Sequence, residues 1–306
     1  MDAQINRFLE LKKQRNAIVL AHYYQDGVIQ DLADFLGDSL ALARAAQNTE
    51  ADVILFCGVH FMAETAKILN PSKKVIIPDM NAGCSLADSA PAEKFLKWKL
   101  EHPEHIFITY INCSTAVKAL SDIICTSSNA EKIVRSVPAD KKICFAPDKF
   151  LGRHIIKQTG REMELWEGSC QVHEYFSEIG LMKLSKEHPT ALILAHPECP
   201  ENLLNYADYV GSTTGILEFA LNNDNMEFII LTEPGIIHQL EKNASSKRFI
   251  PVPHANGCSC NECPYMKLNT LEKMIVSLET LQPEIILDDN LRLQALKPLL
   301  TMLELS

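Results

Sequence analysis

Short runs of apolar residues recur along the chain, separated by stretches whose apolar residues have helical spacing. One set of runs lies at 17–21, 106–110 and 191–195, and a second at 53–57, 143–146 and 228–232. Apolar strands this short, placed between helices, are typical of parallel sheets that are buried on both faces. Two further runs, at 75–77 and 249–252, lead into loops that contain cysteine. The alternation of strands and helices predicts an α/β protein.

The pattern occurs three times, at intervals of 86 and 88 residues. Polar or aromatic residues follow the first strand of each repeat, and a hydroxyl residue follows the next helix. The strand-end and hydroxyl residues of the repeats are His22, Tyr24 and Ser39; Tyr110, Asn112 and Ser127; His196, Glu198 and Thr213. Repeats of this kind predict related structural modules, and equivalent functional groups in each copy indicate that the modules face one shared site.

The repeats predict three α/β modules, at residues 1–86, 87–172 and 173–267, and no long linker separates them. Residues 268–306 are predicted to form helices that pack on the first module. Asn269, with Glu272 three residues later, has the pattern of a helix N-cap. Pro298 is expected to break or restart the helical pattern.

Composition narrows the possible functions. The chain is 47% hydrophobic and 22% charged, as in ordinary globular proteins. Its net charge of −10 argues against a nucleic-acid partner. The N-terminus lacks the pattern of a signal peptide, and no apolar run approaches the roughly 20 residues that cross a bilayer. We therefore expect a cytoplasmic protein without a membrane partner.

Ten cysteines in a reducing compartment favour core positions or metal ligands over disulfides. Cys57, Cys113, Cys125 and Cys144 lie in or beside apolar strands, so we interpret them as core residues.

The strand-end residues are candidates for chemistry because α/β sheets bind ligands beyond the carboxyl ends of their strands. A single tyrosine or histidine in such a place is more often structural, but polar or aromatic residues there in all three repeats favour function. The hydroxyl residues at 39, 127–128 and 212–214 precede helical segments. They are interpreted as helix N-caps, as binding sites for carboxylate or phosphate, or as both. The chain lacks the nucleotide-binding fingerprints G-x-G-x-x-G and G-x-x-x-x-G-K-[ST].

The remaining cysteines suggest a metal centre. Cys84 and Cys170 are 86 residues apart, and the third repeat ends with Cys258, Cys260 and Cys263. These last three alone could form a structural zinc site or a redox pair, although a closed zinc site needs four ligands. One cysteine from each module would instead supply three thiolates to an iron–sulfur cluster. A four-iron cluster held in this way leaves one iron free to act as a Lewis acid.

The motifs resemble the quinolinate synthase (quinolinate synthetase A) family over nearly the whole chain. The segments that carry the resemblance are 21–25, 37–40, 78–85, 109–112, 125–130, 172–174, 196–199 and 211–215. The resemblance implies three pseudo-threefold-related αβα modules, with small parallel sheets, around a central active site. It implies a [4Fe–4S] cluster and the condensation of iminosuccinate with dihydroxyacetone phosphate to quinolinate, phosphate and water, in NAD biosynthesis. It also raises a functional coupling to L-aspartate oxidase, which would supply the unstable imine.

The resemblance also implies roles for particular residues. The cluster ligands would be Cys84, Cys170 and Cys263. Substrate binding would fall to His22, Ser39, Tyr110, Asn112, Ser127, His196, Glu198 and Thr213, with Tyr24 close to the chemistry. From the residues themselves we expect proton transfer by Tyr24, Tyr110, His196 and Glu198, and carboxylate or phosphate binding by Ser127, Ser212 and Thr213. His196 and Glu198 are two residues apart, so on an extended chain they project the same way.

The last cysteine loop departs from the family pattern. Relatives often carry Cys-x-x-Cys-x-x-Cys there, whereas one residue separates Cys258 from Cys260 in this chain. Cys263 is the expected ligand because it precedes the matching segment Pro264-Tyr265-Met266. Cys258 and Cys260 remain alternatives as a ligand, as a redox pair, or with no role. Two other functions also remain open, a different hydro-lyase with the same cluster and a non-catalytic redox sensor.

Overall fold

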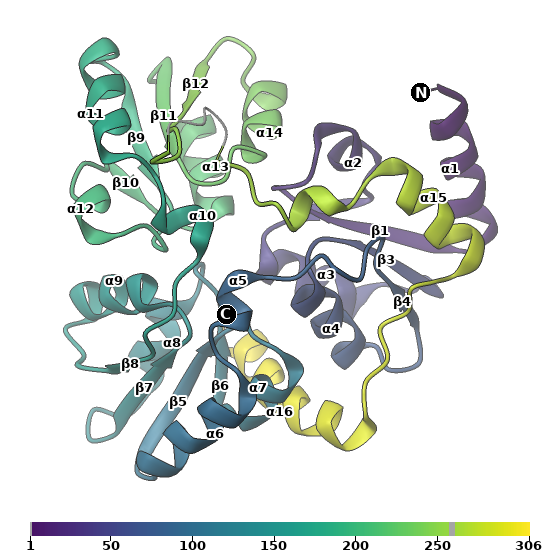
Figure 1. The fold of residues 1–306 in the computed structure, drawn as a ribbon, viewed down its shortest axis with the longest axis horizontal. Coiled ribbons are helices and arrows are strands. Elements are labelled where there is room, and N and C mark those ends of the chain that lie inside the picture. Colours follow the sequence, from purple (N-terminus) through teal and green to yellow (C-terminus); the bar gives the residue numbers. More distant parts are fainter. Residues whose placement is uncertain (1, 257–260) are drawn as a thin grey trace.

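Three parallel sheets, one from each repeat, form the frame of the protein in the computed structural model, which describes residues 2–256 and 261–306 (Figure 1). The strands of the first sheet are β1 (Ala17–His22), β2 (Phe35–Gly37), β3 (Val53–Cys57) and β4 (Lys74–Ile76). Those of the second are β5 (His105–Tyr110), β6 (Ile123–Cys125), β7 (Lys142–Ala146) and β8 (Glu164–Leu165). Those of the third are β9 (Leu192–Ala195), β10 (Tyr209–Val210), β11 (Glu227–Leu231) and β12 (Arg248–Pro251).

The three sheets have the same topology, with strand orders β2-β1-β3-β4, β6-β5-β7-β8 and β10-β9-β11-β12. Every ladder within them is parallel, and Figure 1 shows the three modules around a common centre. The predicted α/β class with three αβα modules is therefore confirmed. β1, β5 and β9 have the same position in their sheets and therefore end at equivalent places. The residues that follow them can thus meet at that centre.

Helices connect the strands and cover the sheets. In the first module they are α1 (Asp2–Gln14), α2 (Gly27–Leu32), α3 (Ser39–Asn48), α4 (His60–Leu69) and α5 (Ser85–Asp88). The second has α6 (Ala92–Glu101), α7 (Thr115–Leu120), α8 (Ala130–Ser136) and α9 (Lys149–Thr159). The third has α10 (Gln171–Glu174), α11 (Glu178–Glu187), α12 (Glu201–Leu204), α13 (Thr213–Asn222) and α14 (Ile236–Asn243). The tail has a 3₁₀ turn, η1 (Met266–Leu268), then α15 (Leu271–Thr280) and α16 (Asp289–Leu305).

The apolar runs correspond closely to the observed strands. β3 has the predicted bounds, and all five of its residues are buried, as expected for a strand covered on both faces. Four short strands, β2, β6, β8 and β10, lie outside these runs, because each has only two or three residues. The apolar runs alone therefore did not locate them.

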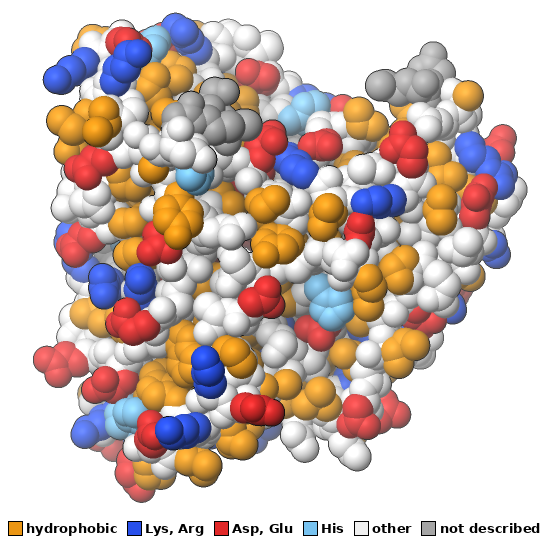
Figure 2. All heavy atoms as spheres, in the orientation of Figure 1, with side chains coloured by type: hydrophobic (Ala, Val, Ile, Leu, Met, Phe, Trp, Pro, Cys, Tyr) orange, Lys and Arg blue, Asp and Glu red, His pale blue; other side chains and the backbone are white. Residues whose placement is uncertain are grey.

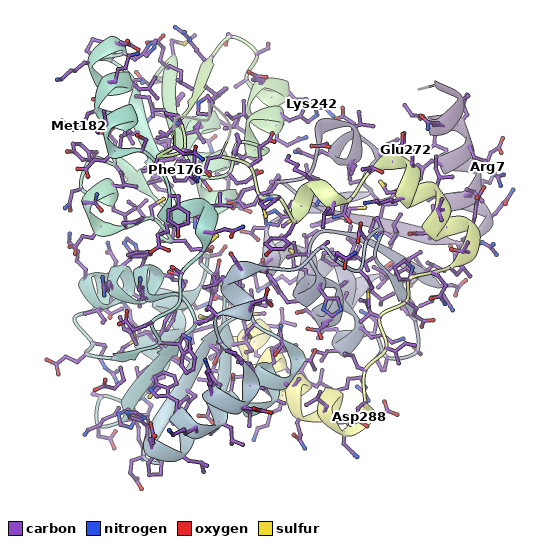
Figure 3. All side chains as sticks on the ribbon, in the orientation of Figure 1. Arg7, Phe176, Met182, Lys242, Glu272 and Asp288 are labelled. Atoms are coloured by element: carbon purple, nitrogen blue, oxygen red, sulfur yellow. The ribbon has the colours of Figure 1, made fainter. Side chains whose placement is uncertain are left out.

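The C-terminal tail contacts two modules. Leu271, Met274 and Leu278 on α15 are buried in the cluster that contains Phe8 of α1. Arg7 of α1 also forms an ion pair with Glu279 of α15 at 2.8 Å, and Figure 3 shows Arg7 and Glu272 on these neighbouring helices. Helix α16 instead packs mainly on α7 and β6 of the second module, and it also touches α4 of the first. The module boundaries themselves stay a prediction.

Two details of the tail differ from the sequence analysis. The N-cap of α15 is Thr270, whose side chain accepts a hydrogen bond from the N–H of Lys273, whereas Asn269 donates to the carbonyl of Gly58. Helix α16 continues through Pro298, which is buried inside it. The packing of α16 between modules outweighs the backbone hydrogen bond that proline cannot donate.

The surface has a mixed character. Figure 2 shows acidic and basic side chains interspersed over one face, with apolar side chains between them. No helix within the described ranges combines the length and hydropathy needed to cross a bilayer.

Candidate active site

A central cavity with an empty volume of about 730 Å³ lies where the three modules meet. Its wall contains residues from the end of each first strand, from all three hydroxyl turns, and from three cysteine loops. Of the residues expected at the site, the wall includes His22, Tyr24, Ser39, Cys84, Tyr110, Asn112, Ser127, Cys170, His196, Glu198, Thr213 and Cys263. Parallel pairing explains this convergence, since the carboxyl ends of the strands in each sheet lie at the same edge.

Ser212 is the expected site residue that does not line this cavity. Its hydroxyl accepts a hydrogen bond from the N–H of Gly215 at 3.2 Å and so caps α13. Asp38 caps α3 in a similar way by accepting from Ala41 at 3.1 Å. The hydroxyl turns thus combine both interpretations. Asp38 and Ser212 cap helices, and Ser39, Thr213 and also Asp38 line the cavity.

The three cysteines at the cavity share one local arrangement. Each directly precedes a short helical turn, and backbone N–H groups of that turn favour its thiolate. These donors are Leu86 and Ala87 for Cys84, His173 for Cys170, and Tyr265 and Met266 for Cys263. Burial acts in the opposite direction: it raises the pKa of Cys84 to about 12 and that of Cys263 to about 11, and it also raises the pKa of Cys170 well above its usual value. Thiols like these keep their protons unless a cation replaces them.

The other cysteines occupy different places. Cys57, Cys113, Cys125 and Cys144 are fully buried in the hydrophobic core, as expected. Cys258 and Cys260 lie outside the described residues, so their proposed alternatives stay predictions.

A chain of contacts connects the two tyrosines expected to transfer protons. Tyr110 donates from Oη to Oε1 of Glu198 at 2.6 Å, and Oε2 of Glu198 lies 3.0 Å from Nδ1 of His173. Nε2 of His173 is 2.9 Å from the hydroxyl of Thr232, which is 2.8 Å from Oη of Tyr24. Five side chains from all three repeats thus form a continuous polar path along the cavity.

Two further contacts join the modules beside this path. Oη of Tyr24 lies 2.9 Å from the hydroxyl of Thr213, and Nε2 of His196 lies 3.3 Å from the hydroxyl of Ser127. Oδ1 of Asn112, at the cavity wall, is buried without a hydrogen-bond partner among the described residues. A buried acceptor of this kind calls for a donor, which a ligand in the cavity can supply.

The protonation states in the cavity follow from burial and neighbouring charges. Burial disfavours ionisation of Glu198, but His173, His196 and the hydroxyl of Tyr110 outweigh it and lower the pKa of this carboxyl. Burial lowers the pKa of His22 to about 4, against the opposing charges of Asp38 and Glu198, and that of His196 to about 3, against the opposing charge of Glu198. Burial also raises the pKa of Tyr110 well above its usual value. Near neutral pH Glu198 is therefore a carboxylate beside the neutral imidazoles of His22 and His196 and the protonated phenol of Tyr110.

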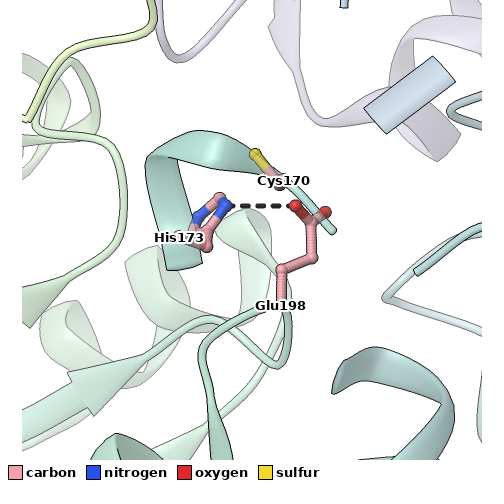
Figure 4. A group of neighbouring side chains, drawn as sticks. All are labelled: Cys170, His173 and Glu198. Atoms are coloured by element: carbon pink, nitrogen blue, oxygen red, sulfur yellow. Dashed lines mark ion pairs between the residues drawn. The ribbon is translucent and has the colours of Figure 1, made fainter. Parts of the chain in front are cut away.

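His173 is the main functional residue that the sequence analysis did not assign. It is buried in α10, and its ring stacks on that of His196 with centroids 4.7 Å apart. Figure 4 shows Cys170 and His173 from the start of α10 facing Glu198 from the loop after β9. Ligand atoms of these three residues lie within 4.8 Å of one another, so the group could hold a metal ion. His173 has no counterpart in the other repeats, and therefore only its place in the segment 172–174 pointed to it.

Glu233 was also missed. It is fully buried at the cavity wall, directly after β11 and Thr232. Burial raises its pKa to about 7, against the opposing charge of Lys267. Its position at the end of a buried strand was a signal that could have identified it.

Comparisons with known proteins identify the relatives of this chain. The model of the quinolinate synthetase A protein family matches residues 6–304. The quinolinate synthase of Trichodesmium erythraeum is 58% identical over 297 residues, which cover 97% of this chain and 92% of that protein. The quinolinate synthase of Synechocystis sp. is 58% identical over 296 residues, 97% of this chain and 93% of that protein. The quinolinate synthase of Nostoc punctiforme is 57% identical over 296 residues, which cover 97% of this chain and 91% of that protein.

Burial of neutral His22 predicts a pH-dependent stability. Its pKa is about 4 in the folded protein, against 6.5 for the free side chain. The stability is thus complete above pH 6.5 and falls as acid protonates the unfolded chain, by roughly 1.4 kcal/mol per pH unit until the folded pKa is reached. His22→Gln should flatten this part of the profile of unfolding free energy, measured with urea between about pH 7 and pH 5. Parallel profiles for the variant and the parent protein would contradict the assignment.

Proposed function

The chain belongs to the quinolinate synthetase A protein family, and we propose that it forms quinolinate from iminosuccinate and dihydroxyacetone phosphate, releasing phosphate and two waters. The observation that carries this proposal is the single cavity lined by strand-end residues and cysteines of all three modules. The resemblance inferred from the motifs is confirmed by the family match and by the identity of more than half of the aligned residues.

The residues at the cavity fit an iron–sulfur cluster. Cys84, Cys170 and Cys263 reach it from three separate loops, and each thiol receives backbone N–H groups that favour the thiolate. Thiolates with such donors are the usual protein ligands of iron–sulfur clusters. A bound [4Fe–4S] cluster would supply one iron without a protein ligand, a Lewis acid toward substrate oxygens. Glu198 and His173 favour a single metal ion at Cys170 as the alternative.

The remaining groups suit two anionic substrates. We assign carboxylate and phosphate binding to the hydroxyls of Ser39, Ser127 and Thr213, with Asn112 accepting a hydrogen bond from substrate. These residues line one cavity together with the neutral His22 and His196. Neutral imidazoles beside helix N-termini can bind or orient anions without the cost of burying extra charge. Ser212 acts in this account by capping the helix that presents Thr213.

Proton transfer is assigned to the path between the tyrosines. The hydroxyl of Tyr24 lies between the hydroxyls of Thr213 and Thr232 and keeps its proton there. The hydroxyl of Tyr110 also keeps its proton, which it donates to Glu198. Glu198 is the ionised member of this path, because its pKa is lowered and Tyr110 donates to it; we assign it to orient Tyr110 and to pass protons along the path. His196, at the wall beside Ser127, can orient substrate or relay a proton.

The reaction has consequences for location and supply. Imines of this kind hydrolyse readily, so a nearby L-aspartate oxidase is the source that we propose for iminosuccinate. We also propose a cytoplasmic site, where reducing conditions keep the cluster thiols available. Two alternatives, a redox sensor and another hydro-lyase, explain the repeated strand-end groups less well. Neither has this pair of substrates for those groups to bind.

The ligand assignment predicts the behaviour of three alanine variants. Under anaerobic conditions the parent protein should be brown and should form quinolinate from the two substrates. Replacing Cys84, Cys170 or Cys263 with alanine should bleach the visible absorption and abolish turnover, because three thiolates hold the cluster. Cys144→Ala, in the core of β7, is the matched control and should keep both. Retained colour and turnover in any one of the three variants would remove that residue from the ligand set.

The proton path predicts a difference between two adjacent tyrosines. Tyr24→Phe removes the hydroxyl that contacts Thr213 and Thr232, and it should lower kcat by about 10²–10⁴-fold with a smaller change in KM. Tyr23→Phe is the control, because Tyr23 is equally buried but does not line the cavity. Steady-state kinetics of quinolinate formation test the pair, and equal rates for both variants would exclude Tyr24 from proton transfer.

A further inference from the structure

The end of β11 carries a buried carboxylate whose role the proposed function leaves open. Glu233 accepts a hydrogen bond at Oε2 from the N–H of Gly235 at 2.7 Å and at Oε1 from the N–H of Cys263 at 3.1 Å. Both carboxylate oxygens are thus engaged with backbone donors. One of these donors belongs to the residue that we assign as the third cluster ligand.

Lys267 extends this contact to the first module. Its Nζ lies 3.8 Å from Oε1 of Glu233 and 3.1 Å from Oδ1 of Asp26. It also donates a hydrogen bond to the carbonyl of Tyr24 at 3.1 Å. The backbone of Cys263 and the backbone of Tyr24 are therefore joined through only two side chains.

The surroundings leave this connection little freedom to move. A Cβ atom added to Gly235 would lie 2.7 Å from Oε2 of Glu233 and 2.8 Å from Cα of Tyr24, closer than atoms in contact can approach. Nε2 of Gln30 donates to the carbonyls of Gly235 and Tyr23, at 2.8 Å in each case. The first and third modules are thus packed backbone against backbone beside Tyr24.

We propose that Glu233 and Lys267 are positioning residues that couple the ligand loop at Cys263 to the placement of Tyr24. The inference rests on the proposed function, because the roles of Cys263 and Tyr24 belong to it. Neither side chain needs to touch a reacting atom: Glu233 fixes the ligand backbone and Lys267 fixes the backbone of the proton donor. Partners that orient metal ligands typically change metal affinity or activity by about 10–100-fold when they are removed.

Two near-isosteric variants and a matched control test the coupling. Glu233→Gln keeps the shape but replaces one carboxylate oxygen with an NH₂ donor, so it cannot accept at both of the positions that face Gly235 and Cys263. Lys267→Met keeps the stem and removes the charge and the hydrogen bonds. The control is Lys242→Met, because Lys242 of α14 pairs with Asp31 of α2 at 2.5 Å across the same two modules, but at the surface (Figure 3). Circular dichroism and melting curves of each holoprotein check the fold.

The first measurement is the rate at which anaerobic holoprotein releases iron to a chelator, which needs no turnover. Glu233→Gln and Lys267→Met should each release iron about 10–100-fold faster than the parent protein, and Lys242→Met should release it at the parent rate. The double variant should be no faster than the faster single variant, because the two residues act as one unit. Lys267→Met should also lower kcat by about tenfold with little change in KM, through the displaced Tyr24.

The proposal is overturned if both variants release iron at the rate of Lys242→Met, or if the double variant shows the product of the two single effects. Should Glu233→Gln fail to fold, Lys267→Met still decides between these outcomes through its iron release and its kcat. A parent protein that keeps its cluster but forms no quinolinate would overturn the proposed function instead. The iron-release rates would then still decide whether Glu233 and Lys267 hold the ligand loop.

Discussion

The burial of Glu198 is the constraint on which the arrangement of the three modules depends. A carboxylate that is only 3% exposed is costly unless donors and positive or polar partners surround it. Here the partners come from different parts of the chain: Tyr110 from the second module, His173 from α10, and His196 from the same loop. Separating the second module from the third would leave this charge without the hydroxyl of Tyr110. The same contacts that stabilise it therefore also assemble the cavity.

Repetition of one strand order explains how so many functional groups reach a small volume. In each module the first strand ends at the cavity, and the last loop places a cysteine in the cavity wall. Three copies therefore supply equivalent groups from three directions. The copies differ in what they supply. The first contributes His22 and Tyr24, the second Tyr110 and Asn112, and the third His196 and Glu198. A symmetric frame thus carries an asymmetric site, as the binding of two different substrates requires.

Much of this arrangement could be predicted from the sequence, because it follows from local patterns. Apolar runs located most of the strands, and the repeat aligned their polar ends. His173 and Thr232 could not be ranked in this way, since their roles arise from contacts with residues 25 or more positions away. The position of Glu233 after a strand was visible in the sequence, but its contacts with Cys263 and Lys267 were not. The course of α16 through Pro298 and the two-residue strand β8 likewise depend on tertiary packing, which overrides local preference. Ser212 lies one residue from Thr213, and only side-chain direction separates the helix cap from the cavity wall.

The central claim is that the three modules share one site in which a metal centre and the substrates meet. Its most direct test is to purify the protein without oxygen and to measure iron, sulfide and the visible absorption, with and without quinolinate. About four irons per chain, and an absorption spectrum that quinolinate perturbs, are the predicted result. Zinc in place of iron, or a cluster whose spectrum is indifferent to quinolinate, would contradict the shared site.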